Sequence, residues 1–334
     1  MTSSMNHWER VRAALKGEEV DRVPVSLWRH WPVEDETAQG LANAMVRWQR
    51  QYDFDLVKFM PTGMYGVHDW GTQTVYNPGF RGNRISTKPG LTQAEEWPKL
   101  ATLDPHKGAL GQEVEAIRLA AEELKGSVPI LQTIFSPLTT AIKLAGDRVH
   151  GDMRLRPDLL KQGLEIIADV TIRFAQACLQ AGAHGVFFAT QGASYRLFSE
   201  AEYSEFGATY DIKVLNAIRS DETINMLHVH GFDIMFDLAA SYPVEMINWH
   251  DRLTWPSLKE AQSRFDGLLV GGIDDQVTIA EGPIDQIRWQ ARDAVEQTGG
   301  RRILVGPGCV IPTNTPDAHI RAVIETVQEM AAVR

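Results

Sequence analysis

Residues 157–190 read PDLLKQGLEIIADVTIRFAQACLQAGAHGVFFAT, and this stretch sets the expectation for the whole fold. Its first part, Pro157–Gly182, has a proline at the start and a glycine at the end, the usual order at the two ends of a helix. Its last part, Gly185–Thr190, is a short apolar run of the kind that forms strands buried on both faces. A helix followed directly by a buried strand predicts one repeat of a parallel α/β sheet.

The same alternation extends in both directions along the chain. Seven further apolar runs are expected to be strands: Val23–Trp28, Leu56–Phe59, Pro129–Ile134, Ile224–Val229, Val244–Trp249, Gly267–Gly272 and Arg302–Gly306. Other predicted helices are Ser199–Ser220, Phe232–Ala240, Ser257–Arg264, Pro283–Thr298 and Asp317–Val333. Eight strands that alternate with helices, without a linker-like stretch, predict a single (β/α)8 TIM barrel domain over residues 1–334. A doubly wound sheet is the alternative, because the count depends on short segments.

One region, Tyr65–Gly90, interrupts the alternation after the second predicted strand. It is rich in glycine, threonine and aromatic residues, which indicates a β-hairpin excursion. Such a hairpin is either a lid over the end of the barrel or a surface feature with no role in a site.

The amino-acid composition argues against nucleic acids and membranes as binding partners. The 334 residues include 33 Lys+Arg and 43 Asp+Glu, a formal charge of −10, which argues against a nucleic-acid or anionic membrane surface. No apolar stretch approaches the roughly 18–20 residues that span a bilayer, and the start of the chain lacks the apolar core of a signal peptide. We therefore expect a cytoplasmic protein in a reducing compartment.

Several kinds of cofactor site are also excluded by pattern. The two cysteines, Cys178 and Cys309, are too few for a disulfide scaffold or a four-cysteine zinc module. No G-x-G-x-x-G follows an early strand and no Walker A lysine loop occurs, so no nucleotide cofactor is expected. A G-x-S-x-G nucleophile elbow is absent as well.

The polar residues that follow the predicted strands are the functional candidates, because the active site of a (β/α)8 barrel lies at the C-terminal ends of its strands. They are Arg29, Lys58, Ser136, Gln191, His228, His230, His250, Asp251, Asp274, Asp275 and Cys309. This set holds three of the ten histidines and one of the two cysteines, a concentration that favours a site over a plain scaffold.

The strongest local pattern is His228-Val229-His230. Side chains two apart on a strand point to the same face, so both imidazoles can face the barrel mouth. Zinc binds imidazole nitrogen and thiolate sulfur, and Cys309 in the glycine-rich loop GPGCVIPTNTP supplies a third ligand. The alternative is a pair of histidines that are only hydrogen-bonded. Cys178 lies inside an apolar helix and is expected to be a buried packing residue.

The other candidates carry less specific patterns. Arg29 can bind a substrate carboxylate through its planar guanidinium, or can form a salt bridge at the rim. Lys58, Gln191 and His250 are predicted substrate-binding residues.

Two acidic positions have alternative roles. Asp251 is a catalytic candidate, or pairs with the neighbouring Arg252. Asp274, with Asp275 beside it, either binds substrate, orients a ligand histidine or caps the next helix.

Together, several motifs resemble those of the uroporphyrinogen decarboxylase superfamily. In chain order they are WERVRAALKGEEVDRVPVSLWR, YDFDLVKFMPTG, SPLTTAIKLAG, LHVHG, GGID and VGPGCVIPTNTPDAHIRAVIETV. The superfamily includes the decarboxylase itself and zinc-dependent, corrinoid-linked methyltransferases. The resemblance covers nearly the whole chain and implies a (β/α)8 barrel.

The resemblance is nearer to the methyltransferase branch, whose zinc motif is H-x-C followed far downstream by a cysteine. His228 matches the histidine, His230 stands at the first cysteine position, and Cys309 matches the second. This implies Zn²⁺ on these three residues with one position open, and transfer of a methyl or other one-carbon group to a small anionic substrate held by Arg29 and Lys58. Because no D-x-H-x-x-G segment is present, any corrinoid would come on a separate partner protein. The resemblance and the apolar C-terminal helix also permit a homodimer.

The decarboxylase branch gives a second hypothesis, a metal-free carboxy-lyase. Arg29 and Asp55 resemble its substrate-binding arginine and central aspartate, and His228 and His230 would then transfer protons. However, the second arginine, the tyrosine and the last-strand histidine of that branch have no counterparts, since Pro307 stands at the last position. A catalytically silent binding barrel is the third reading.

Overall fold

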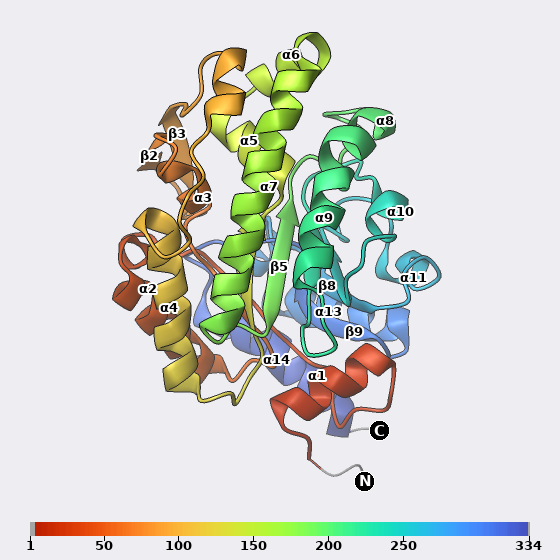
Figure 1. The fold of residues 1–334 in the computed structure, drawn as a ribbon. Helices are drawn as coiled ribbons and strands as arrows, with labels where there is room; N and C mark the ends of the chain where they lie inside the picture. Colours follow the sequence, from red (N-terminus) through yellow and green to blue (C-terminus); the bar gives the residue numbers. More distant parts are fainter. Residues whose placement is uncertain (1–3, 333–334) are drawn as a thin grey trace.

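Seven parallel strands form one curled sheet in the computed structural model, which describes residues 4–332 (Figure 1). In sheet order the strands are β1 (Val57–Phe59), β4 (Ile130–Phe135), β5 (Gly185–Thr190), β6 (Met226–Val229), β7 (Met246–Trp249), β8 (Leu268–Ile273) and β9 (Ile303–Pro307). They correspond to seven of the eight predicted runs. Almost every strand residue is buried, as expected for a parallel sheet that is covered on both faces.

The first predicted strand, Val23–Trp28, differs from the expectation. It is not a regular strand and makes a single parallel bridge, between Val25 and Val305 of β9. Its backbone also accepts a hydrogen bond at Val25 from the amide of Asp55, just before β1, so this segment joins the two edges of the sheet. The ladder stays short because Pro24 has no N–H and the Val25 amide donates to the Asp55 carboxylate instead.

Helices surround the sheet on its outer side (Figure 1). The long ones are α2 (Ala38–Tyr52), α4 (Gly108–Leu124), α7 (Pro157–Gln180), α13 (Ile284–Thr298) and α14 (Asp317–Ala332). The shorter ones are α1 (His7–Lys16), α3 (Tyr65–His68), α5 (Pro137–Ala145), α6 (Arg148–Leu155), α8 (Glu200–Tyr203), α9 (Thr209–Ile218), α10 (Phe236–Ala239), α11 (Leu258–Ala261) and α12 (Thr278–Glu281). None of the described helices is both long and apolar enough to cross a membrane.

Three features that the sequence singled out lie in or beside helices. The predicted helix Ser199–Ser220 is interrupted by a π-helical turn at Ser204–Ala208. Ser136, a rim candidate, caps α5, since its hydroxyl accepts a hydrogen bond from the amide of Thr139. Cys178 is fully buried in α7, as predicted.

The region Tyr65–Gly90 contains α3 and an antiparallel pair, β2 (Gln73–Tyr76) and β3 (Arg84–Lys88). The tip of this hairpin reaches the loops that follow β8 and β9. The Phe80 carbonyl accepts a hydrogen bond from the amide of Thr313 at 2.6 Å, and Arg81 donates to the side chain of Gln276 at 2.7 Å. The hairpin therefore extends across the C-terminal end of the sheet.

Candidate metal centre and adjoining pocket

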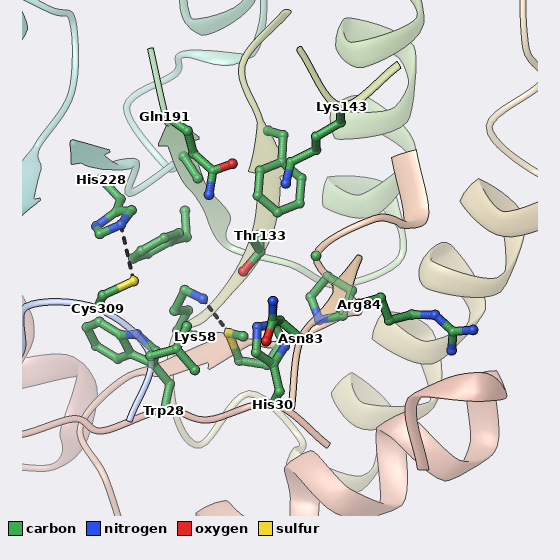
Figure 2. Close-up of a pocket in the computed structure, with 17 residues that line it drawn as sticks. Trp28, His30, Lys58, Asn83, Arg84, Thr133, Lys143, Gln191, His228 and Cys309 are labelled. Carbon is green, nitrogen blue, oxygen red and sulfur yellow. Dashed lines mark hydrogen bonds between the residues drawn. The ribbon is translucent and has the colours of Figure 1, made fainter. Parts of the chain in front are cut away.

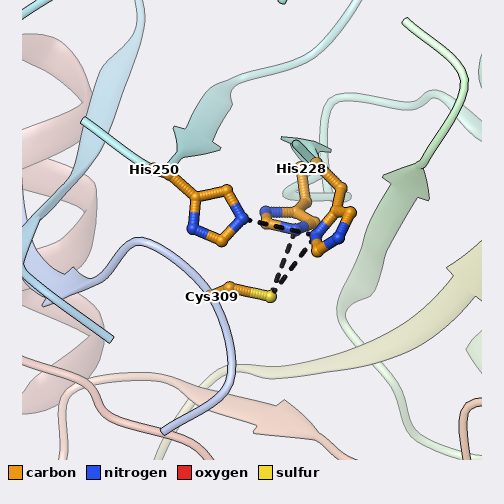
Figure 3. A group of neighbouring side chains, drawn as sticks. His228, His250 and Cys309 are labelled. Atoms are coloured by element: carbon orange, nitrogen blue, oxygen red, sulfur yellow. Dashed lines mark hydrogen bonds between the residues drawn. The ribbon is translucent and has the colours of Figure 1, made fainter. Parts of the chain in front are cut away.

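Four side chains converge at the C-terminal ends of β6, β7 and β9: His228, His230, His250 and Cys309 (Figure 3). Their ligand atoms all lie within 4.8 Å of one another. Sγ of Cys309 is 3.6 Å from Nε2 of His228 and 3.7 Å from Nδ1 of His230. Nε2 of His250 is 3.4 Å from Nδ1 of His230.

These separations fit a tetrahedral zinc site. Zinc bonds of about 2.0–2.1 Å to nitrogen and about 2.3 Å to sulfur place two nitrogens about 3.3 Å apart, and nitrogen and sulfur about 3.6 Å apart. The three separations above match these edges. The donor set of three imidazoles and one thiolate also suits zinc.

His228 is oriented from within the sheet. Its Nδ1 lies 2.6 Å from Oδ1 of Asn248, in β7. The amide nitrogen of Asn248 donates to the carbonyls of Val270 at 2.9 Å and Pro307 at 3.0 Å, so its oxygen must face His228. His228 therefore carries its proton on Nδ1 and presents the lone pair of Nε2 to Cys309. The sequence reasoning missed Asn248, although a polar residue inside a buried strand is a signal of this kind.

His250 is oriented in the same manner by Asp275. Its Nδ1 lies 2.9 Å from Oδ1 of the carboxylate, which leaves Nε2 facing the cluster. A carboxylate behind a histidine is a common support of metal ligands. His250, predicted to bind substrate, thus lies in the metal cluster, and Asp275 takes the orienting role that the sequence left open.

The electrostatics of the cluster favour a thiolate. Burial alone would raise the pKa of Cys309, but the neighbouring imidazoles, His228 first, hold it well below its usual range. Burial also acts to lower the pKa of His250, yet Asp275 and Cys309 outweigh it and raise that pKa to about 10. A thiolate is the form of cysteine that binds a metal.

A cavity of about 150 Å³ adjoins the cluster, with His228 and Cys309 in its wall (Figure 2). Its lining includes the predicted residues Lys58 and Gln191, together with residues the sequence did not single out: Trp28, His30, Met60, Asn83, Arg84, Lys143 and Phe187. A small molecule in this cavity would touch the metal ligands directly.

Two lysines give the cavity a positive character. Lys58 is buried with its ammonium beside Met60 and 4.2 Å from the Phe187 ring. Lys143, half-buried, lies 4.4 Å from the Phe135 ring. Neither has an acidic partner among the described residues. Burial lowers the pKa of Lys58 to about 7 and that of Lys143 to about 8, so a bound anion would stabilise their charged forms.

Arg29 lies outside this cavity. Trp28 and His30 line the cavity, and the residue between them faces the opposite way, as expected for extended chain. The guanidinium of Arg29 lies 4.3 Å from the ring of Trp31 and 5.1 Å from that of Trp48, against α2. The predicted contact between Arg29 and a substrate carboxylate has no support in this position.

Asp55 lies at the other end of the sheet, two residues before β1, and is wholly buried. Its carboxylate accepts hydrogen bonds from Arg10 at 2.7 Å, from the amide of Val25 at 2.8 Å, and from Arg22 and His7. Burial acts to raise its pKa, but these partners outweigh it and lower the pKa. Asp55 therefore has a structural role, and its position corrects the expectation of a catalytic one.

The remaining acidic candidates also face away from the cavity. Asp251 accepts a hydrogen bond from the amide of Gly272 at 2.9 Å and lies 3.8 Å from Arg252; burial raises its pKa to about 6. Asp274 accepts from the amides of Gln276 at 2.8 Å and Thr278 at 3.1 Å, so it caps the turn into α12. Both act as structural residues at the ends of β7 and β8.

The chain is similar over most of its length to one protein family and to methyltransferases and decarboxylases within it. The family model for uroporphyrinogen decarboxylase (URO-D) matches residues 6–330. A methylcobamide:CoM methyltransferase MtaA of Methanosarcina barkeri is 26% identical over 340 residues, which cover 97% of this chain and 98% of the relative. A uroporphyrinogen decarboxylase of Dechloromonas aromatica is 30% identical over 254 residues, covering 70% and 68%.

Solved structures support the same fold. A methyltransferase from Methanosarcina mazei superposes with a TM-score of 0.86 at 23% identity, covering 98% of this chain and 99% of that one. A B12-independent methionine synthase from Shewanella sp. W3-18-1 gives a TM-score of 0.60 at 15% identity, covering 94% and 95%. The relatives thus include both methyltransferases and decarboxylases, as the sequence motifs predicted. The chain belongs to the uroporphyrinogen decarboxylase family.

Proposed function

We propose that the protein is a zinc-dependent enzyme that transfers a methyl or other one-carbon group to a small anionic substrate. The observation that carries the proposal is a set of three separations, Cys309–His228, Cys309–His230 and His230–His250, each of which matches an edge of a zinc tetrahedron. The names of the Methanosarcina relatives support methyl transfer.

We assign separate roles to the residues that bind the metal, orient its ligands and line the cavity. His228, His230 and Cys309 would hold the ion, and the side chain of Asn248 fixes the orientation of His228. When bound, zinc lowers the pKa of a substrate thiol or hydroxyl and so supplies a nucleophile at neutral pH. Trp28 and Phe187 line the cavity beside it with aromatic rings, which disfavour water there once a substrate is bound.

Recognition of the substrate falls to the two lysines of the cavity. An anionic group between Lys58 and Lys143 would supply a salt-bridge partner, which neither lysine has among the described residues. Gln191, which lines the same cavity, offers a neutral hydrogen-bonding group. Both lysines line the same small cavity as His228 and Cys309, so a short substrate can contact the lysines and the metal cluster at the same time.

We further propose that the methyl donor is a corrinoid carried by a separate protein. Large apolar side chains are exposed in the loops that follow the strands, around the end of the sheet that holds the cavity. Phe80 at the tip of the hairpin is 66% exposed, Val277 after β8 is 57% exposed and Trp255 after β7 is 46% exposed. Exposed apolar groups of this kind are typical of a protein-docking surface.

The proposal treats residues 1–334 as one barrel domain, with Val23–Trp28 in the place of an eighth strand. We do not adopt the metal-free carboxy-lyase alternative. Its two key residues, Arg29 and Asp55, both lie outside the cavity.

The experiment is metal analysis of protein purified without chelator, followed by a methyl-transfer assay with methylcobalamin and 2-mercaptoethanesulfonate. We expect about one zinc per chain and transfer that chelation abolishes and added Zn²⁺ restores. His230→Ala should lose the metal, whereas Arg196→Gln, which alters a surface ion pair with Asp233, should retain it. Protein that is free of zinc, or His230→Ala that keeps it fully, would refute the proposal.

A further inference from the structure

We propose that His250 is a fourth, exchangeable ligand of the metal centre, and that Arg81 of the β2–β3 hairpin controls its position through Asp275. The inference rests on the proposed metal site and adds to it a link between the hairpin and the metal. It makes Arg81 a positioning residue, because its side chain acts through Asp275.

The placement of His250 is that of a ligand. Its Nε2 faces the cluster at 3.4 Å from His230, an edge that zinc would span. Its Nδ1 is held by Asp275 at 2.9 Å. Zinc sites closed by four protein ligands are typically structural, whereas catalytic sites keep a position open. A fourth protein ligand beside a substrate cavity must therefore be able to leave.

The residues that orient His228 and His250 belong to different parts of the fold. Asn248, behind His228, is fixed by carbonyls of β8 and β9, which belong to the sheet itself. Asp275, behind His250, lies in a loop and is contacted by the hairpin. The hairpin can therefore influence His250 without disturbing His228.

The contacts between Arg81 and this loop are specific. Nη1 of Arg81 donates to the backbone carbonyls of Asp275 and Val310, each at 3.2 Å, and lies 3.6 Å from Oδ2 of Asp275. Nη2 donates to Gln276 at 2.7 Å, and Gln276 donates in turn to the same Oδ2 at 3.3 Å. The carboxylate thus faces His250 with one oxygen and the hairpin with the other.

The same hairpin forms a wall of the cavity. Asn83 and Arg84, next to Arg81 in the chain, line it. Among the described strands β3 pairs only with β2 and is mostly exposed, so the hairpin contacts the barrel through its tip and through Tyr76 and not through the main sheet. A hairpin displacement that admits substrate would withdraw Arg81 from Asp275 and loosen His250 in the same motion.

The thermodynamic coupling between metal binding and the position of the hairpin can be measured without an assay of enzymatic activity. If the hairpin contact favours metal binding, metal binding must favour the closed hairpin by the same factor, and such couplings are commonly about 5- to 150-fold. The readouts are Zn²⁺ affinity by chelator competition, and the rate of chymotrypsin cleavage after the exposed Phe80 with and without Zn²⁺.

Three variants separate the possible causes. Arg81→Gln removes the contacts with Asp275 and with the carbonyl of Val310, and His250→Gln removes the ligand. Lys88→Gln is the matched control, because Lys88 lies in strand β3 of the same hairpin, is exposed and does not line the cavity. Circular dichroism of each variant verifies that it is folded.

We expect Zn²⁺ to slow cleavage after Phe80 in the unaltered protein. Arg81→Gln and His250→Gln should each bind Zn²⁺ at least about fivefold more weakly and lose the protection, while Lys88→Gln keeps the affinity. The Co²⁺-substituted His250→Gln protein should also show altered visible absorption, since one nitrogen ligand has changed. Unaltered affinity in Arg81→Gln or in His250→Gln would overturn the inference alone. Failure of the unaltered protein to bind Zn²⁺ would instead overturn the proposed function.

Discussion

The imidazole of His228 donates a hydrogen bond from Nδ1 to the side-chain oxygen of Asn248 across 2.6 Å. This contact decides which nitrogen of His228 faces Cys309, because the amide nitrogen of Asn248 is already committed to two carbonyls of the sheet. The candidate metal centre is therefore built on a strand-to-strand contact.

Replacing Asn248 tests this relationship. Asn248→Ala should weaken Zn²⁺ binding about 10- to 100-fold, the usual effect of removing the partner of a metal-bound histidine. Chelator competition measures the affinity. Asn225→Ala is a suitable control, since Asn225 is also buried beside β6 but contacts backbone of β5 instead. Equal affinities in Asn248→Ala and the unaltered protein would contradict the assigned tautomer of His228.

The two cysteines should differ in reactivity. In metal-free protein, Cys309 should react with iodoacetamide at pH 6–7, because the imidazoles hold its pKa well below the usual range. Cys178 should not react, because burial raises its pKa and blocks access. Mass spectrometry of the alkylated peptides measures both, and Zn²⁺ should protect Cys309. Alkylation of Cys309 that is unaffected by Zn²⁺ would argue against its role as a ligand.

The cavity lysines should govern affinity for the anionic part of the substrate. Lys58→Met keeps the volume and removes the charge, and should raise KM about tenfold or more, as expected for a lost charge-assisted hydrogen bond of about 1.5–3 kcal/mol. Lys143→Met should act in the same direction. Steady-state kinetics with an anionic thiol and with a neutral thiol of similar size separates the effects. An equal loss for both thiols would show that the lysines do not recognise charge.

Asp55 should matter for stability and leave the metal site intact. Asp55→Asn breaks a buried network with Arg10 and Arg22 and should cost about 3–5 kcal/mol of unfolding free energy. Because the pKa of Asp55 is lowered in the folded protein, its contribution is present above the unfolded pKa and is lost as pH falls through the folded one. Urea unfolding from pH 7 to pH 3 should therefore show a weaker acid dependence in the variant. Lost Zn²⁺ binding in folded Asp55→Asn would contradict this structural role.

The sequence predicted those features that depend on local pattern. Continuous apolar runs located seven strands, and β5 has the predicted bounds Gly185–Thr190. The spacing of His228 and His230 identified two members of the cluster, because alternation along a strand is a local property. The same alternation explains why Arg29 lies outside the cavity, since it places the Arg29 side chain on the face opposite to Trp28 and His30. Asp55 precedes its strand and so lies at the wrong end of the sheet for the site.

The features that the sequence did not predict depend on register and on contacts between distant segments. Residue His228 pairs with Asn248 between β6 and β7, and this register brings His250 next to His230. No local pattern specifies that register. Lys143 was missed because it lies on helix α5 and does not follow a strand. The approach of Arg81 to Asp275 joins residues 194 apart in the chain.

The central claim is that His228, His230 and Cys309 hold zinc, and anomalous X-ray scattering at the zinc edge tests it most directly. Crystals of protein purified without chelator should show one anomalous peak per chain, within about 2.0–2.3 Å of Nε2 of His228, Nδ1 of His230 and Sγ of Cys309. The absence of a peak at these atoms in crystals grown with added Zn²⁺, or a peak bound elsewhere on the chain, would contradict the account.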